Sequence, residues 1–314
     1  SDTYRLQHRG GKGVRGMTTR DDDLQMDLAV VDTHDFLFFF SNRGRVYPLR
    51  AFRIPGDTSR TTKGVALVNL LPLSRGEVIQ AMLTIQNPKE DYLLVLATKL
   101  GEVKALRTGE LSNIRPSGLI VMDLESEDEL VSVAQVGDAK DIVMVSEKGQ
   151  AIRFAVTNLT PRSRSAGGVR GMRLLAGDQV IAMAPVLGNN HLVIVSQRGY
   201  GKSTPLCRYP RHARGGQGVR TFKVTAKTGP VAAARVVSAD EGQSILLISA
   251  KSQVIRVTLK DFRVTGRDTQ GVIIWRDREP DDYVASIALD ENDHAAANGS
   301  QNGHVSTNGA TEEN

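Results

Sequence analysis

Short apolar runs separated by tight turns recur along the whole chain. Five of these runs lie at 36–40, 92–97, 142–145, 192–195 and 245–248, and each is followed by a turn and a second apolar run. This pattern is typical of β-hairpins. A further apolar run closes each repeat, at 78–85, 130–136, 180–186, 231–237 and 283–289. Since no segment has a convincing helical period, we predict an all-β fold.

A glycine followed by a branched apolar residue marks each repeat. These step glycines are Gly13, Gly64, Gly118, Gly168, Gly218 and Gly271, at intervals of 51, 54, 50, 50 and 53 residues. Repeats of this length with about four strands each are typical of propeller blades. We therefore predict a six-bladed β-pinwheel, a propeller-like ring of four-stranded blades in which each repeat forms one blade. An open β-solenoid is the alternative.

The repeat also predicts the domain boundaries. We expect one domain over residues 1–289, with units at about 1–34, 35–89, 90–138, 139–188, 189–240 and 241–289. Only twelve residues precede Gly13, whereas the other hairpins begin 26–28 residues before their step glycines, so the first blade is expected to be incomplete. Residues 290–314 are rich in Ala, Asn, Gly and Ser, and we expect a disordered acidic tail there.

Charge is distributed unevenly. The formal net charge is +5, but 290–314 holds five acids and no Lys or Arg, so residues 1–289 carry +10. A folded part this basic favours a polyanionic partner, although an ordinary basic protein stays possible. The single cysteine, Cys207, excludes a disulfide framework within the chain and fits a cytoplasmic protein. No apolar run reaches the length of a membrane span.

Basic residues follow the same repeat. One set precedes the step glycines by three or four residues: Arg9, Arg60, Arg115, Arg164, Arg214 and Arg267. A second set lies at the hairpin turns: Arg43, Lys99, Lys148, Arg198 and Lys251. A third set lies just after the turns: Arg45, Lys104, Arg153, Lys202 and Arg256. Lys63 lies just before a step glycine, and Arg15, Arg170 and Arg220 lie two residues after one.

Positions that recur once per blade lie at equivalent points around a ring, so these cations predict a basic belt. A convex belt suits a bent DNA duplex, because arginine binds phosphate oxygens through two hydrogen bonds. Phosphate contacts carry no base information, so binding should tolerate any sequence. Two alternatives are solvated loop charges and a propeller-type protein-interaction scaffold.

The densest glycine-rich basic segment lies near the N-terminus: Gln7, His8, Arg9, Gly10, Gly11, Lys12 and Gly13. Its glycines allow backbone N–H groups to approach a phosphate. It resembles the gyrase A box, Gln-Arg-Arg-Gly-Gly-Lys-Gly, at six of seven positions, with His8 as the departure. Segments at 33–35, 39–47, 68–73, 168–174 and 199–202 also resemble the C-terminal domain of the bacterial DNA gyrase A protein, so the similarity covers about residues 3–289.

This resemblance implies a domain that wraps duplex DNA around its rim with positive handedness and has no catalytic residues of its own. It implies two partners, the breakage-reunion domain of the same gyrase A subunit and the separate ATPase subunit of gyrase, with which the domain would introduce negative supercoils in the cytoplasm. It also implies no cofactor in this domain, since the ATP and Mg²⁺ of the holoenzyme bind elsewhere. The alternative within the superfamily is the equivalent domain of topoisomerase IV, in which the box is usually decayed.

Other chemistry is less well supported. Gly201-Lys202-Ser203 resembles part of a P-loop, but Ser196 stands where that motif needs a glycine, and the segment lies on a predicted hairpin. The six histidines have no metal-ligand spacing. Trp275 ends an apolar run, so packing in the last blade is favoured over base stacking.

Overall fold

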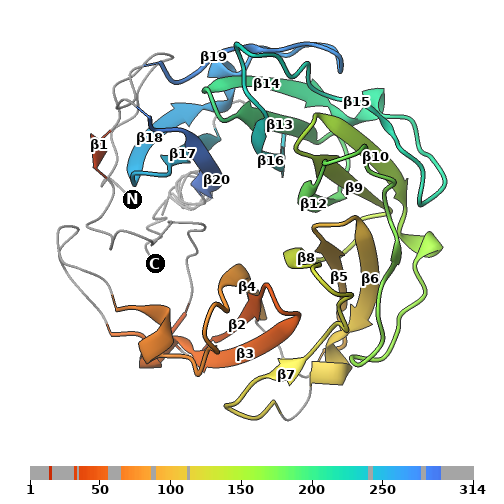
Figure 1. Cartoon of the computed structure of the whole chain (residues 1–314), viewed down its shortest axis with the longest axis vertical. Helices are drawn as coiled ribbons and strands as arrows, with labels where there is room; N and C mark the ends of the chain where they lie inside the picture. The colour runs from red at the N-terminus through yellow and green to blue at the C-terminus, as the bar shows by residue number, and fades with distance from the viewer. Residues whose placement is uncertain are drawn as a thin grey trace, which may run out of the picture.

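The computed structural model describes residues 14–15, 32–33, 35–55, 65–85, 90–111, 114–239, 243–276 and 281–290. In this part of the chain the strands form five four-stranded antiparallel sheets, which stand around a common centre (Figure 1). The only helices among these residues are short 3₁₀ turns: η1 (Ala51–Arg53), η2 (Leu67–Asn69), η3 (Thr108–Leu111), η4 (Val156–Asn158), η5 (Leu206–Arg208) and η6 (Leu259–Asp261). The predicted all-β ring is confirmed.

Each sheet is named here as a blade, numbered by the unit that supplies its hairpin. The hairpins are β2 (Phe36–Ser41) with β3 (Arg45–Arg50), β5 (Leu93–Thr98) with β6 (Glu102–Arg107), β9 (Asp141–Ser146) with β10 (Gln150–Ala155), β13 (His191–Ser196) with β14 (Tyr200–Pro205), and β17 (Ser244–Ser249) with β18 (Gln253–Thr258). The inner strands are β4 (Ile79–Ile85), β8 (Leu130–Gln135), β12 (Val180–Val186), β16 (Val231–Val237) and β20 (Val284–Asp290). The leading hairpin strands and the inner strands all begin within one residue of the predicted runs.

The fourth strand of each blade comes from the next unit. The step strands are β1 (Val14–Arg15), β7 (Leu119–Ile120), β11 (Val169–Arg170), β15 (Val219–Arg220) and β19 (Val272–Ile273). Strand β11, for example, belongs to unit 4 but pairs with β6 of blade 3. The prediction that one repeat forms one blade is therefore wrong in this respect, because each step strand completes the preceding sheet.

The same exchange links the two ends of the described chain. Val14 pairs with Val254 and Arg15 with Gln253, so β1 is the outer strand of blade 6 (Figure 1). Val65, after the second step glycine, lies outside any strand. Most of residues 1–34 lie outside the described residues, so the expected incomplete first blade stays a prediction.

Apolar side chains pack between adjacent blades. Phe38 and Phe40 of blade 2 share a buried cluster with Leu94 and Leu96 of blade 3, for example. Trp275, just after β19, is completely buried in a cluster formed by blades 5 and 6, which confirms that it packs in the core. Burying each large apolar side chain contributes about 1.5–3 kcal/mol, so the ring is held by contacts between neighbouring units.

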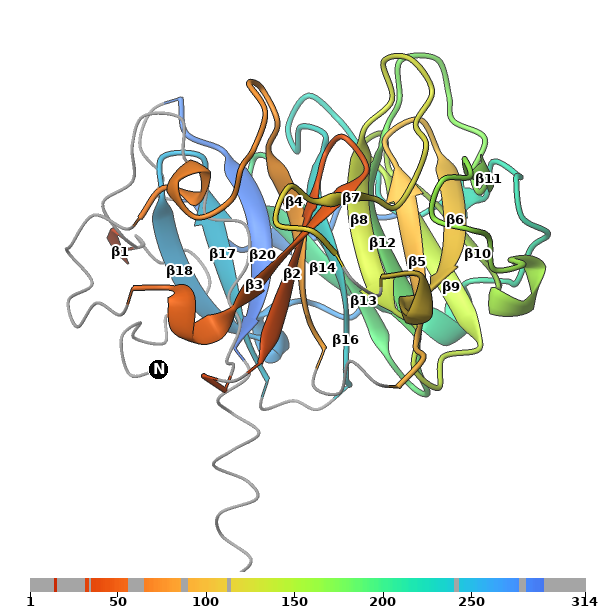
Figure 2. The ribbon, with the colours of Figure 1, turned by 90° about the horizontal axis from the view of Figure 1, so that it is seen from below.

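The inner strands line the centre of the ring in the order β4, β8, β12, β16 and β20, and each contacts the next. Figure 2 shows the ring from the side, with the strands running between its two faces. A cavity of about 510 Å³ lies along the inner strands, and its lining includes alanines from several of these strands, such as Ala134 and Ala184. Small side chains suit this position because the inner strands converge there.

Candidate nucleic-acid interface

The arginines before the step glycines lie in loops that cross from one blade to the preceding one. These rim loops are 114–118, 159–168, 209–218 and 262–271. In blade 3, the N–H of Arg162 donates to the carbonyl of Ala105 on the outer hairpin strand, at 2.9 Å. The N–H groups of His212 and Thr265 donate in the same way to Arg153 and Ser203, at 2.7 and 2.9 Å. The rim loops therefore cover the outer strands of the blades.

Backbone hydrogen bonds also join consecutive units along the rim. The N–H of Asp123 donates to Ala166 at 3.2 Å, that of Arg173 to Gly216 at 2.9 Å, and that of Lys223 to Thr269 at 3.0 Å. Each bond runs from the segment after one step strand to the rim loop of the next unit. The spacing between successive loops is thus fixed before any ligand binds, which lowers the entropic cost of binding.

The predicted rim arginines are available to solvent to different degrees. Arg115, Arg164, Arg170 and Arg220 are exposed, whereas Arg214 and Arg267 are half-buried. The guanidinium of Arg214 donates to the carbonyl of Arg170 at 2.6 Å, which brings two of these arginines together. Arg220 forms an exposed ion pair with Asp268 at 3.3 Å, and such a pair adds little stability.

The turn cations form a second group. Arg43, Lys148, Arg198 and Lys251 are exposed, and Lys99 is half-buried. Arg43 donates to the carbonyl of Arg75 at 2.7 Å, and Lys148 to that of Ala176 at 2.5 Å. These bonds hold two of the turn cations against the loop that precedes the inner strand. The side chains stay accessible to a large anionic partner.

The third predicted set has a different role. Arg45 is half-buried and donates to the carbonyl of Ser117 in a rim loop, at 2.8 Å. Arg153 forms an ion pair with the buried carboxylate of Asp141 at 2.6 Å. These cations therefore hold loops and strands together rather than project from the rim.

The position of Lys202 contradicts its predicted role as a DNA contact. Its side chain is completely buried, and its ammonium donates to the carbonyls of Gly266 and Arg267. Burial lowers the pKa of Lys202 to about 7, against an opposing effect of Asp268. An ammonium in this position is not accessible to a DNA phosphate, so Lys202 is removed from the predicted contact residues.

Part of the predicted site lies outside the described residues: Gln7, His8, Arg9, Gly10, Gly11, Lys12, Gly13, Arg60 and Lys63. Arg15 is described through its backbone, in β1. The contribution of the box-like segment to the interface stays a prediction.

Three further cations were missed by the sequence analysis. Arg173, Lys223 and Arg276 each stand five residues after a step glycine, and all three are exposed. The backbone N–H groups of the first two bind the neighbouring rim loops, so their side chains start beside the loops that hold Arg214 and Arg267. Comparison of the repeats at this position could have found them.

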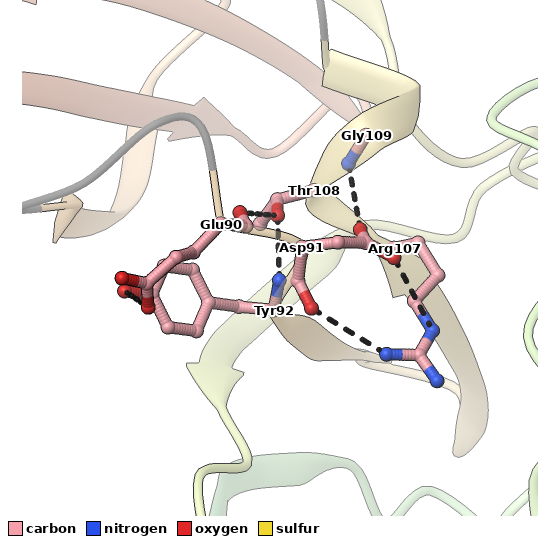
Figure 3. Close-up of polar contacts among 6 residues, drawn as sticks. All are labelled: Glu90, Asp91, Tyr92, Arg107, Thr108 and Gly109. Atoms are coloured by element: carbon pink, nitrogen blue, oxygen red, sulfur yellow. Dashed lines mark hydrogen bonds and ion pairs between the residues drawn. The ribbon is translucent and has the colours of Figure 1, made fainter.

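The end of β6 that is farthest from its turn contains an arginine in a different setting (Figure 3). The Nε of Arg107 lies 3.8 Å from the carboxylate of Asp91, and both side chains are half exposed. Asp91 also accepts the N–H of Gly109 at 3.0 Å, and Thr108 donates to the carbonyl of Glu90 at 3.1 Å. Arg107 is therefore a surface arginine outside the rim loops with an acidic neighbour.

The structure also bears on the other motifs. The P-loop-like segment lies in strand β14, and Cys207 is an exposed free thiol. Within the described ranges, no three His, Cys, Asp or Glu side chains are grouped closely enough to hold a metal ion. No helix in that part of the chain is long and apolar enough to cross a membrane.

The ring of four-stranded sheets and its arginine-bearing outer loops define a β-propeller domain with a cationic rim. A domain family described as the DNA gyrase C-terminal domain, a β-propeller, matches residues 1–32, 35–86, 92–136, 140–187, 190–238 and 243–289. The chain belongs to this family, in agreement with the predicted resemblance.

Individual relatives agree with this assignment. The DNA gyrase A protein of Halalkalibacterium halodurans is 46% identical over 286 residues, which are 91% of this chain and 34% of that protein. The corresponding protein of Clostridium acetobutylicum is 39% identical over 293 residues, 93% of this chain and 35% of that protein. The chain spans about a third of the length of these curated relatives.

Solved structures share the fold. A DNA gyrase A C-terminal domain superposes with a TM-score of 0.76 and 28% identity, covering 92% of this chain and 93% of that one. The C-terminal domain of a DNA topoisomerase IV has a TM-score of 0.73 at 23% identity, over 87% of this chain and 85% of the other, which is a similarity of fold.

Proposed function

We propose that this chain binds duplex DNA along its rim and wraps it, with little dependence on sequence, as the C-terminal domain of a gyrase A protein. The observation that carries the proposal is the linked series of rim loops, each of which presents an arginine at an equivalent place around the ring. Membership in the gyrase C-terminal family supports the same function.

The energetics favour wrapping over a single local contact. Smooth bending of a 20–30 base-pair duplex costs about 1–6 kcal/mol. Each phosphate contact releases counterions, and contacts repeated on successive blades can offset that cost. A curved row of cations gains these contacts only if the duplex bends along it. The rim geometry therefore couples affinity to bending.

The wrapped segment would serve a larger enzyme. We propose two partners, the breakage-reunion domain of the same gyrase A subunit and the separate ATPase subunit of gyrase, with negative supercoiling as the outcome. The ATP and Mg²⁺ of that reaction would bind to those parts, and the setting would be the bacterial cytoplasm. Those roles rest on the family.

The test is the closure of a nicked plasmid by DNA ligase in the presence of the purified chain. We expect a shift toward positively supercoiled topoisomers that grows with protein concentration. A variant with R115A, R164A, R214A and R267A should lose the shift, whereas R107A should keep it because Arg107 lies outside the rim loops. Unchanged topology with the wild-type chain would contradict wrapping.

A further inference from the structure

One side-chain position supports the rim loop of the next unit in four blades. It is the third residue after the glycine of the hairpin turn: Tyr47, Lys104, Ile152 and Lys202. A Cβ on Gly118 would lie 2.5 Å from the ring of Tyr47, and one on Gly216 would lie 3.6 Å from Ile152. These two side chains therefore lie directly against a rim loop.

In blades 3 and 5 this position holds a lysine whose ammonium binds the loop backbone. Lys104 donates to the carbonyls of Val121, Arg164 and Ala166, at 2.8, 2.9 and 2.7 Å. Lys202 donates to the carbonyl of Gly266 at 2.7 Å, to the hydroxyl of Thr269 at 3.3 Å and to the carbonyl of Arg267. The three N–H donors of each ammonium thus have three acceptors.

The acceptors connect these lysines to the rim arginines. Each ammonium binds the main-chain carbonyl of the very arginine that precedes the step glycine, Arg164 or Arg267. The lysine side chains are 1% and 0% exposed, so neither can reach a ligand directly. Hydrogen bonds from a charged donor are stronger than neutral ones, so in their protonated form the lysines restrict the loop more than the tyrosine or isoleucine at the same position.

We infer that Lys104 and Lys202 are positioning residues for DNA binding, each of which fixes the loop conformation that presents its own arginine to a backbone phosphate. The inference rests on the proposed function. The lysines add no phosphate contact of their own. Their effect on DNA is transmitted through Arg164 and Arg267 respectively.

The consequence is a specific pattern of coupling. R267A should weaken affinity for a random-sequence duplex severalfold, and K202M should weaken it by a similar factor. In the double variant the two factors should not multiply, because both changes remove the same phosphate contact. In the variant that combines K202M with R164A the two factors should multiply, since Lys202 supports the rim loop of Arg267 and Arg164 lies in a different rim loop. K104M should show the opposite pattern: its effect on affinity should not multiply with that of R164A, and it should multiply with that of R267A.

Three measurements separate the outcomes. Affinity is measured by fluorescence anisotropy for all single and double variants, folding by circular dichroism, and loop order by hydrogen exchange. We expect K202M to keep the wild-type spectrum and to increase exchange in residues 262–271 but not in 159–168. Equal coupling of K202M to both arginines would overturn the inference, as would loss of the folded spectrum in both lysine variants, which would assign the lysines to general stability.

The proposed function fails in a different way. If R164A and R267A alone leave affinity unchanged, the rim loops do not contact DNA. If the arginine variants weaken binding but the lysine variants do not, only the positioning role is overturned. The exposed turn lysine provides a control, because K148M should be independent of both arginines.

Discussion

The hairpin turns end on a residue with a positive φ angle. Gly44, Gly101, Gly149 and Gly199 have φ between 67° and 93°, and blade 6 has Ser252 at the same place, with φ of 59°. A side chain in this region costs about 1–3 kcal/mol that glycine avoids.

We therefore expect S252G to raise the free energy of unfolding by about 1 kcal/mol, after allowance for the greater freedom of glycine in the unfolded chain. The reverse change, G149S, should lower it by at least about 2 kcal/mol, because its Cβ would collide with the carbonyl oxygen of Phe222. Urea denaturation monitored by circular dichroism measures both. A destabilised S252G would contradict the argument.

The buried lysines predict a dependence of stability on pH. Burial lowers the pKa of Lys202 from 10.5 to about 7, so between these values the unfolded chain binds more protons than the folded one. The free energy of unfolding should therefore rise with pH across this window, by at most about 1.4 kcal/mol per pH unit for this group, and this gain is lost as pH falls to about 7.

The measurement is the difference in unfolding free energy between the wild type and K202M from about pH 6 to 10. This difference should not depend on pH below about 7, and above that pH it should shift in favour of the wild type. The corresponding change for K104M should begin about one unit higher, because burial lowers the pKa of Lys104 to about 8. A difference that is constant throughout would contradict titration of these lysines.

In several blades, an acidic side chain accepts hydrogen bonds from the hairpin turn. In blade 4, the buried Asp178 accepts the hydroxyl of Ser146 at 2.7 Å and the N–H groups of Lys148 and Gln179, both at 2.9 Å. Asp128 and Asp282 accept N–H groups at the corresponding turns of blades 3 and 6. These repeated hydrogen bonds fix the turn relative to the inner strand of its own blade.

D178A should therefore lower the free energy of unfolding by about 2–4 kcal/mol, because it leaves the buried Ser146 hydroxyl and two partly buried N–H groups without their acceptor. D138A, at an exposed loop position, should change it by less than about 0.5 kcal/mol. Thermal and urea denaturation of the two variants test this difference. Equal changes in the two variants would show that the hydrogen bonds of Asp178 contribute no more to the free energy of unfolding than an exposed carboxylate does.

The strands also show which features of the fold can be predicted from residues that are neighbours in the sequence. The leading hairpin strands and the inner strands were predicted within one residue of their starts, because an apolar run and its turn are neighbours in sequence. The step strands were assigned to the wrong blade, because two residues such as Val169 and Arg170 carry no alternating pattern and their pairing is long-range. The burial of Lys104 and Lys202 was missed for a related reason: the rim-loop carbonyls that bind them lie 60 and 64 residues away.

The two parts of the chain carry net charges of opposite sign. Residues 1–289 carry a formal charge of +10 and the C-terminal segment holds five acids. Strand β20 includes Asp290, so a deletion that preserves the described fold starts at residue 291. This deletion removes four acids, Glu291, Asp293, Glu312 and Glu313, and raises the net charge from +5 to +9.

We expect this deletion to tighten DNA binding severalfold at low salt, because the acids compete with phosphates for the same cations. The gain should shrink toward high salt, where charges more than about 10 Å apart are screened. A variant with the four acids changed to Gln or Asn separates charge from length and should match the deletion. Affinities at about 50 and 200 mM salt, measured on two unrelated duplexes, test the argument. A deletion that tightens binding while the neutralised variant does not would show that the tail acts by its bulk rather than its charge.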